Sequence, residues 1–478
     1  MEKLSIDILE KYQNKDKNNI KIIDEKLNDI FSNFNKKIIV LDDDPTGVQT
    51  VHDISVYTNW NIENIEKGFN ESNSMFFILT NSRSFSKSQT IEVHTEITEN
   101  IIKVSKKLNK DFIIILRGDS TLRGHYPEET ETIAKVLEKN NIKVDGEVII
   151  PFFLEGGRYT INNIHYVQEG EYLVPAGDTE FALDKTFGYK ESDLCKWVEE
   201  KTNGKFKKED VKAISIEDEN EMKIEHITDI LKSCNNFDKV IVNSISYFHI
   251  KVFTLSLLNA ILEGKRFVYR TAAAFTKVIG NVSDKDLLKK EELIDKNTKN
   301  GGIIIVGSHV NKTSLQLEKL KEIKEGIEYI EFNQHLVLEE GGLEREANRV
   351  INITNDYIEN GKTVVIYTNR KRLDINTGNK EDELKIASQI SNSLTSIFSN
   401  LKSKPSFIIA KGGITSSSIG VDGLKVKCAK VKGQIYPGIP VWMTDATSKF
   451  PNMPYIIFPG NVGKEDTLKV IVEELIKK

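Results

Sequence analysis

The chain has 478 residues, of which 39% are apolar and 29% are charged. This composition is typical of a globular protein with a sizeable core and excludes a wholly disordered chain, while the length favours two or three domains over one. The 66 basic and 71 acidic residues leave a formal charge of -5, so charge gives no reason to expect a nucleic-acid partner.

The sequence also argues against a membrane or secreted protein. It has no run of about 20 apolar residues, which a spanning helix needs, and its first residues interleave acids with lysines, unlike a secretory signal. Three widely spaced cysteines, Cys195, Cys234 and Cys428, form no metal-type pair and no disulfide framework, which suits a reducing compartment. We therefore expect a cytoplasmic protein.

In chain order, residues 1–36 are polar, rich in lysine and asparagine, and weakly helical in their periodicity. We expect a helical leader packed on the first domain, with a partly loose arm as the open alternative. From residue 37 onward, short apolar runs alternate with segments of helical spacing. Five runs read as strands covered on both faces: 36–41, 75–80, 112–116, 147–153 and 239–244.

Between the runs, apolar residues recur at helical steps, as in 97–108 and again in 387–401. Alternating strands and helices predict βαβ units and mostly parallel sheets. A highly charged stretch over 282–302 ends in a glycine pair and predicts a domain boundary near residue 300. The predicted fold is α/β with two domains, 37–285 and 300–478, each with a mostly parallel sheet flanked by helices and with the active site in the cleft between them.

The second domain repeats a strand–glycine–helix junction three times. The strands are followed by Gly307-Ser308, by Gly412-Gly413 with Thr415, and by Gly460 with Gly463. Glycine lets the backbone turn sharply and approach a ligand, and the N–H groups at a following helix start bind phosphate oxygens. No P-loop and no GxGxxG fingerprint is present, but three junctions together favour a phosphate-bearing ligand such as a nucleotide.

In the first domain, polar loops follow the predicted strands. The first strand ends in Asp42-Asp43-Asp44-Pro45-Thr46-Gly47, and later ones lead into loops with Arg83, with Arg117 to Arg123, and with Arg158. Three adjacent carboxylates need donors or a cation to stay ionised, and arginine forks suit a carboxylate. The set predicts a pocket for a small, anionic, hydroxylated molecule. Each of His52, His125, His165 and His309 reads more simply as structural, so none is assigned a catalytic role.

Six motifs in order, DDDPTG, NSRSFS, RGDSTLRGH, PFFLEGGRYT, AKGGITSSS and FPGNVGKED, resemble those of the four-carbon acid sugar kinase family. The resemblance covers about residues 37–470. It implies a substrate domain followed by a nucleotide domain, ATP with Mg²⁺, and phosphorylation of acids such as threonate, erythronate or their 3-oxo forms. The partners would be the sugar acid and ATP, with a homodimer as one possible assembly.

The resemblance and the strand-end pattern together give a set of candidate residues. Asp119 is the first candidate for the catalytic base, with Asp44 second. The substrate-binding candidates are Asp43, Thr46, Arg83, Arg117, Ser120, Thr121, Arg123 and Arg158. The nucleotide-binding candidates are Ser308, Gly412, Gly413, Ile414, Thr415, Gly460, Asn461, Val462 and Gly463. No metal ligands are assigned.

Two positions depart from the family pattern, an ADD-x-TG turn and a Lys-x-Asp-Ser-Thr loop. Here Asp42 replaces the alanine and Arg117 replaces the lysine, which leaves the identity of the sugar acid open. Two other functions stay open as well. One is a haloacid-dehalogenase-like phosphatase that uses Asp42 and Asp44, and the other is a non-catalytic sensor of a sugar acid or nucleotide.

Overall fold

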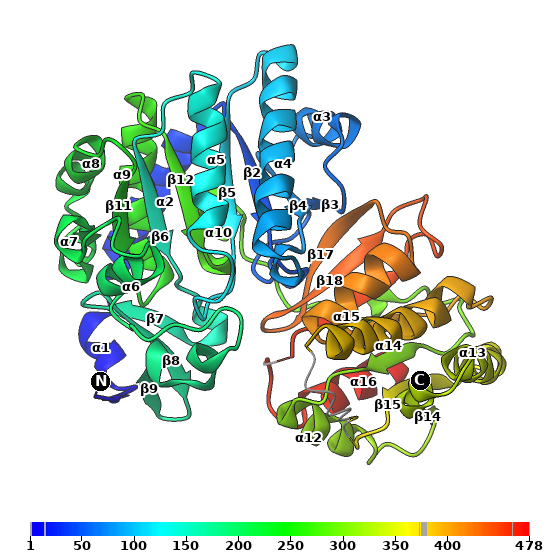
Figure 1. Ribbon diagram of the computed structural model, residues 1–478. Coiled ribbons are helices and arrows are strands. Elements are labelled where there is room, and N and C mark those ends of the chain that lie inside the picture. Colours follow the sequence, from blue (N-terminus) through cyan, green and yellow to red (C-terminus); the bar gives the residue numbers. More distant parts are fainter. Residues whose placement is uncertain (1, 14–15, 372, 374–379, 461, 478) are drawn as a thin grey trace. The chain divides into compact units, whose positions relative to one another are not determined.

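The computed structural model describes residues 2–13, 16–371, 373, 380–460 and 462–477 (Figure 1). It divides into two compact units, Met1–Val51 with Asn59–Asp284 and His52–Thr58 with Lys285–Lys478. The second unit takes in residues 52–58 because strand β3 (Ser55–Tyr57) pairs antiparallel with β17 (Cys428–Tyr436). Among the described residues, no helix is both long enough and apolar enough to cross a membrane.

A seven-stranded parallel sheet forms the centre of the first unit. Its order is β10 (Lys212–Ile214), β11 (Asp238–Val242), β6 (Gly146–Ile150), β12 (Phe267–Thr271), β5 (Phe112–Arg117), β2 (Lys37–Asp42) and β4 (Met75–Leu79). All five apolar runs predicted as strands are strands here, and the runs in β2, β4 and β5 are buried throughout. Strand β12, which lies between β6 and β5, is not among the predicted strands.

Helices cover both faces of this sheet, as a parallel sheet requires. One face carries α3 (Ile62–Asn70), α4 (Lys87–Leu108) and α5 (Glu128–Lys139), and the other carries α2 (Lys17–Ser32), α8 (Ile224–Lys232), α9 (Tyr247–Leu262) and α10 (Ala273–Ile279) (Figure 1). Helix α4 begins at a capping box in which Ser86 and Gln89 satisfy each other's backbone N–H groups. The cap fixes the chain just after the loop that carries Arg83.

The N-terminal residues and a small antiparallel sheet complete this unit. Ile23 and Leu27 of α2 are buried, and α2 packs along α9. The small sheet has the order β1 (Leu4–Ser5), β9 (Tyr172–Pro175), β8 (Ile164–Glu169) and β7 (Arg158–Ile161). The remaining helices of the unit are α1 (Ile8–Tyr12), α6 (Leu194–Lys201) and α7 (Ile216–Asn220).

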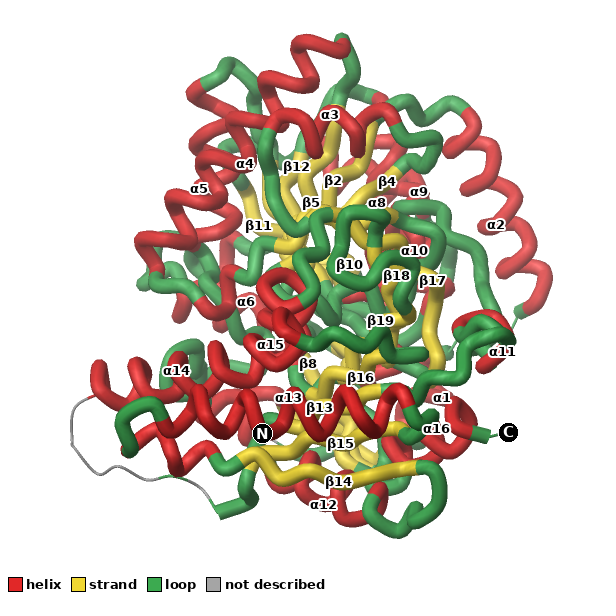
Figure 2. Tube along the Cα trace, turned by 90° about the vertical axis from the view of Figure 1, so that its right-hand side faces the viewer, coloured by secondary structure: helices red, strands yellow, loops and turns green. Residues whose placement is uncertain are grey.

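The second unit has a mixed sheet. Strands β14 (Ile327–Phe332), β15 (Thr363–Thr368), β13 (Ile303–Val306), β16 (Ile408–Lys411) and β19 (Pro454–Phe458) follow one another in parallel (Figure 2). The antiparallel strands β18 (Ile439–Thr444), β17 and β3 extend it. Helices α12 (Asn311–Leu320) and α16 (Thr467–Ile476) pack together on the same core, and α13 (Gly342–Glu359) packs against α14 (Lys380–Asn400), which contacts α15 (Gly413–Ser418). The short helix α11 (Lys290–Leu293) precedes β13.

Candidate functional site

The predicted substrate loops emerge together from the first sheet. Strand β2 lies between β5 and β4 and runs parallel to both, and the register pairs Asp42 with Leu79 and with Arg117. Parallel strands end at the same edge of a sheet, where ligands bind in open α/β folds. The acidic turn after Asp42, the loop with Arg83 and the loop after Arg117 therefore start side by side.

Asp42 is completely buried beneath the acidic turn. A side-chain carbon at Gly47 would lie 2.0 Å from each Asp42 carboxyl oxygen, so the turn closes over this carboxyl only because residue 47 is glycine. Burial raises the pKa of Asp42 well above its usual value, although the charge of nearby Arg117 lowers it in part. Asp42 therefore supports the turn, and its burial favours the neutral form of the carboxyl.

Arg83 is tied to the acidic turn by its whole guanidinium group. Its Nη2 and Nε donate to the two carboxyl oxygens of Asp43 at 2.8 and 3.1 Å, and its Nη1 lies 3.5 Å from Asp44 Oδ2. The amide of Thr46 donates to the other Asp44 oxygen at 2.8 Å. The structure thus brings these four predicted residues together, and carboxylates of the protein itself occupy the Arg83 fork.

Asp119 is surrounded by donors. The Thr121 hydroxyl and Arg123 Nε both donate to Asp119 Oδ2, the latter at 2.7 Å. Burial by itself would raise the pKa of Asp119, but the charges of Arg123 and Arg83 and these hydrogen bonds outweigh it and hold that pKa well below its usual range. The Asp119 carboxylate is therefore ionised and can accept a further hydrogen bond.

Arg117 and Arg123 flank Asp119 in the sequence, but the Arg117 side chain contacts the acidic turn. Arg117 is still within strand β5, where the register sets it next to Asp42. Its Nη2 donates to Gln49 at 2.9 Å, and its Nη1 lies 3.6 Å from Asp42 and 3.7 Å from Asp43. Arg83, which approaches from the neighbouring loop, takes the place beside Asp119 that the linear sequence suggested for Arg117.

The backbone of Ser120 is positioned by a buried histidine, His165. His165 Nε2 contacts the Ser120 carbonyl oxygen at 2.8 Å, and its Nδ1 contacts the Thr160 hydroxyl at 3.0 Å. Burial lowers the pKa of His165 to about 4, so the imidazole donates to the Ser120 carbonyl in its neutral form. His165 thus positions the loop, in keeping with the structural role expected for it.

Arg158 opens strand β7 and lies at the same site. Its guanidinium is 5.6 Å from the ring centre of Phe181, and the guanidinium of Arg123 is 5.0 Å from the same ring. The charges of Asp119 and Arg123 both act on Arg158, which is only 7% exposed. The three predicted arginines Arg83, Arg123 and Arg158 therefore gather around Asp119.

Two buried charged residues that were not predicted from the sequence, Arg270 and Glu129, connect the substrate loops. Arg270, near the end of β12, donates from Nη2 to the Arg123 carbonyl at 2.6 Å, and its Nη1 lies 3.8 Å from Glu129. Glu129 accepts from the Ser82 hydroxyl at 2.7 Å. The pair therefore connects the loop before α4 with the loop after β5, and Gly118 leaves the space that the Arg270 guanidinium fills. An arginine inside the apolar run FVYRT was the available sequence signal.

We expect Gly118→Ala to lower the free energy of unfolding by about 1–3 kcal/mol, the usual cost of overpacking a core. The new side-chain carbon would lie 1.5 Å from Arg270 Nη1, and Arg270 is buried. Chemical denaturation measures the loss. In an Arg270→Ala background the same substitution should cost much less, and equal costs in both backgrounds would show that the guanidinium is not the obstacle.

In the second unit, the three glycine junctions follow the adjacent strands β13, β16 and β19. A side-chain carbon at Gly412 would lie 3.7 Å from Thr415 Oγ1 and 3.9 Å from the Ser308 side chain. Gly412 has a φ of 112°, which favours glycine, and its amide donates to the Phe458 carbonyl of the neighbouring strand at 2.8 Å. The first and second junctions therefore lie against each other.

The third junction is held by two side chains that the sequence analysis did not single out. Lys411 is fully buried and donates from Nζ to the carbonyls of Pro459 and Gly460 at 2.6 and 3.3 Å. Gln316 of α12 donates to the Val462 carbonyl at 3.2 Å. A lysine at the end of a buried strand, just before a glycine pair, was the available signal for Lys411.

The other predicted nucleotide residues line these junctions. Gly413 opens α15, Ile414 is 71% exposed, and Gly463 has a φ of 82°. No heavy atom lies within 4 Å of where a Gly460 side chain would start, so this position has open space beside it. Asn461 lies outside the described residues.

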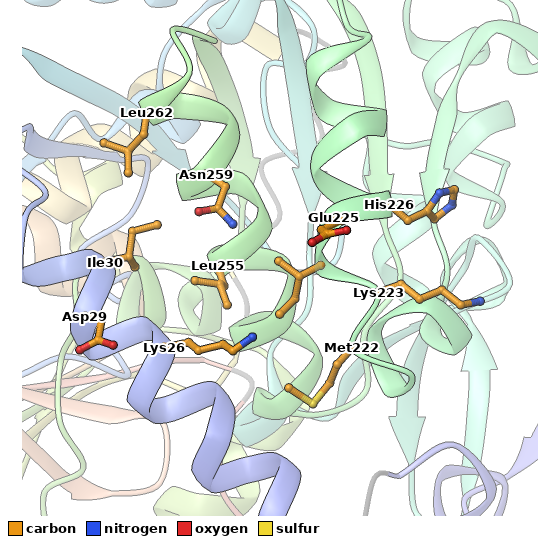
Figure 3. A pocket seen from close by; sticks show the side chains of 11 residues that line it. Lys26, Asp29, Ile30, Met222, Lys223, Glu225, His226, Leu255, Asn259 and Leu262 are labelled. Atoms are coloured by element: carbon orange, nitrogen blue, oxygen red, sulfur yellow. The ribbon is translucent and has the colours of Figure 1, made fainter.

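A separate cavity of about 800 Å³ lies among α2, α8 and α9 (Figure 3). Lys26 and Asp29 on α2 face Leu255 and Asn259 on α9. None of the arginines or aspartates of the substrate loops lines it. The charged loops at the carboxyl edge of the sheet therefore remain the candidate substrate site of this unit.

Comparison with known proteins also assigns different kinds of ligand to the two halves of the chain. Residues 38–279 match the family model described as a sugar-binding N-terminal domain, and residues 303–468 match the one described as a nucleotide-binding C-terminal domain. No curated protein gives a significant match.

Two solved structures share the fold of the chain. A Haemophilus influenzae protein of the DUF1537 family is 16% identical, with a TM-score of 0.59, over 92% of this chain and 100% of its own. A protein from Salmonella typhimurium LT2 is 13% identical, with a TM-score of 0.63, over 91% of this chain and 98% of its own. With the sugar-binding model spanning half of the sequence and the nucleotide-binding model following it, the chain belongs to the four-carbon acid sugar kinase family.

Proposed function

We propose that the protein is an ATP-dependent kinase that transfers the γ-phosphoryl group to a hydroxyl of a small sugar acid, most simply one of four carbons. The observation that carries the proposal is the pairing on one chain of two sites. A nucleotide-binding unit presents three adjacent glycine junctions, and a sugar-binding unit gathers arginines around an ionised aspartate.

The glycine junctions fit the triphosphate of ATP. Gly412 and Gly460 leave the backbone open to close approach, and the Ser308 and Thr415 side chains lie beside Gly412. Backbone N–H groups and hydroxyls are the donors that phosphate oxygens use in nucleotide sites. Mg²⁺ would be held largely by the phosphates themselves, as is usual for this ion, and would neutralise charge on the transferred group.

Asp119 is our first candidate to orient the acceptor hydroxyl, and Asp44 is the second. Phosphoryl transfer depends mainly on positioning and on neutralised oxygens, so the hydroxyl needs an ionised acceptor beside it. The arginines around Asp119 keep it ionised, and its side chain is 10% exposed. Asp44, 12% exposed, shares Arg83 with Asp43.

The phosphatase alternative conflicts with the geometry of the acidic turn. Its nucleophile would be the first aspartate of the turn, Asp42. That carboxyl is sealed under Gly47, has no exposed surface, and is in an environment that favours its neutral form. A buried neutral carboxyl is a poor nucleophile, so the kinase proposal is preferred.

An ATP-consumption screen tests the proposal. The purified protein with ATP and Mg²⁺ is offered the stereoisomers of threonate and erythronate and their 3-oxo forms, and ADP and the phosphorylated acid are measured. We expect turnover with at least one acid. Phosphate release from sugar phosphates without ATP would support the phosphatase instead, and thermal stabilisation by a ligand without turnover would support a sensor.

ATP binding should take up a proton at pH 8, because of Lys411. Burial, with the nearby charge of Lys312, lowers the pKa of Lys411 to about 7, so its amine is mostly neutral at pH 8. Added phosphates favour the charged amine and raise this pKa. The uptake should approach one proton per ATP at pH 8 and shrink toward pH 6, and ATP affinity should fall as pH rises above 7.

Calorimetry in two buffers of different ionisation enthalpy measures this proton uptake. Lys411→Met should abolish most of it. Lys449→Met is the matched control, because Lys449 is also a lysine of lowered pKa that donates to a carbonyl, that of Ser399, away from the junctions. Undiminished uptake in Lys411→Met would assign the proton to another group.

A further inference from the structure

The charges of the substrate site are unevenly compensated. Arg83 is paired with Asp43 and Asp44, and Arg123 is paired with Asp119. Arg117 faces Asp42 and Asp43 as well. Three of the four arginines that the sequence placed at the strand ends therefore already have carboxylate partners within the protein.

Arg158 differs from the other three. In the described part of the chain it forms no ion pair. Its Nη1 donates to the backbone carbonyls of Gly156 and Gly157. Within the residues that the structure describes, its Nε is buried without a hydrogen-bond partner and its Nη2 has none either. Arg158 is only 7% exposed, and a buried guanidinium without a directly paired carboxylate is costly.

The position of Arg158 is set by long-range pairing. Its backbone exchanges hydrogen bonds with Phe153, which follows β6, at 2.9 and 3.1 Å, and two residues further on Thr160 bridges to Ser244 beyond β11. The small antiparallel sheet thus holds Arg158 over the carboxyl edge of the parallel sheet. The Phe181 ring lies against the guanidinium groups of both Arg158 and Arg123.

We propose that Arg158 is the receptor for the carboxylate of the substrate, with Phe181 shaping the pocket. A carboxylate supplies the direct ion pair that Arg158 lacks, and its two oxygens can accept from the Nε and Nη2 of a guanidinium. This assignment deepens the proposed function and rests on it. It replaces Arg83 as first candidate, because the Arg83 fork is filled by Asp43.

The assignment also orients the substrate. Arg123 bonds Asp119 and shares the Phe181 ring with Arg158, so a carboxylate on Arg158 lies at the Asp119 end of the site. The hydroxyls of a short acid then extend toward Asp119. Arg158 therefore determines binding specificity, because it favours an acid over the matching neutral polyol.

Direct binding tests this without requiring turnover. Calorimetry measures the affinity of threonate and erythronate, and of the neutral alditols threitol and erythritol, for the wild-type protein, Arg158→Gln and Arg158→Lys. Loss of a charge-assisted fork corresponds to roughly 10- to 100-fold in affinity. We expect Arg158→Gln to lose at least about tenfold for the acid and little for the alditol, and Arg158→Lys to fall between Arg158→Gln and the wild type.

The control is Arg266→Gln, in which the arginine removed pairs with Asp111 beside the amino end of β12. It should bind the acids normally. Unchanged acid affinity in both Arg158 variants, or equal losses for acid and alditol, overturns the assignment, as does a wild-type protein that binds no acid. Arg158-dependent acid binding without ATP-dependent product upholds the assignment and rejects the kinase. If Arg158→Gln does not fold, the ratio of acid affinity to alditol affinity in Arg158→Lys tests the assignment. A ratio equal to that of the wild type would overturn it.

Discussion

Asp119→Asn is expected to lower kcat for the sugar acid by on the order of 10²-fold or more, the usual effect of losing a positioned base. The amide keeps the shape of the side chain but loses the charge that Arg123 and Arg83 stabilise. The acceptor hydroxyl then loses its ionised hydrogen-bond acceptor, while the nucleotide junctions in the other unit are untouched. ATP affinity should change little.

Steady-state kinetics with saturating ATP measures this effect. Asp111→Asn is the matched control, because Asp111 lies just before the same strand, β5, and pairs with Lys36 and Arg266. It should keep near-normal kcat. If Asp119→Asn also kept near-normal kcat, the role would pass to Asp44, and Asp44→Asn would then show the loss.

The pH dependence gives a second readout. Since the pKa of Asp119 lies well below its usual range, the carboxylate stays ionised through mildly acidic pH. The wild-type kcat should therefore show no loss from protonation of Asp119 between about pH 4 and 6, where an ordinary aspartate begins to protonate. A fall in kcat with an apparent pKa near that of a free aspartate would argue for a less stabilised carboxylate as the base.

Gly460→Val is expected to weaken ATP binding about 10- to 100-fold, with little change in the free energy of unfolding. No heavy atom lies within 4 Å of the new side-chain start, so the first carbon of the new side chain meets open space. The space it fills is the space that a phosphate group needs to approach the backbone. A steric cost of about 1–3 kcal/mol corresponds to that loss of affinity.

Titration of ATP against the variant, with parallel denaturation curves, separates the two effects. Gly460→Ala adds only one carbon and should give a smaller loss of ATP affinity. The loss should therefore increase with side-chain size from glycine through alanine to valine. Sugar-acid affinity should hold in both variants. A normal ATP affinity in Gly460→Val would move the phosphates away from the third junction.

Local sequence pattern determined much of the fold. The runs in β2, β4, β5, β6 and β11 are buried strands, as their continuous apolar character predicts, and the stripe over 97–108 lies in α4. Glycines after β13, β16 and β19 identified three turns. These features are encoded by residues close together in the chain, so one stretch of sequence suffices to predict them.

Strand β12 and the small antiparallel sheet were not identified. The run in β12 contains Arg270, a charge that local pattern assigns to the surface. It fits a buried strand because Glu129, the Arg123 carbonyl and the space at Gly118 accommodate its guanidinium. Strands β7, β8 and β9 are only four to six residues long, and they are stable only through their pairing with one another. Their register depends on partners that the sequence does not name.

The charged residues of the site also separate what the sequence predicts from what only the tertiary structure decides. The sequence determined that arginines and aspartates follow the strands of the first unit, and it named Arg83, Arg158 and Asp119 as members of the site. Only the tertiary structure decided which charges neutralise each other, because ion pairing depends on distances of a few ångströms between residues far apart in the chain. Arg83 is paired 40 residues back with Asp43, whereas Arg158 is buried with no carboxylate partner in the described chain.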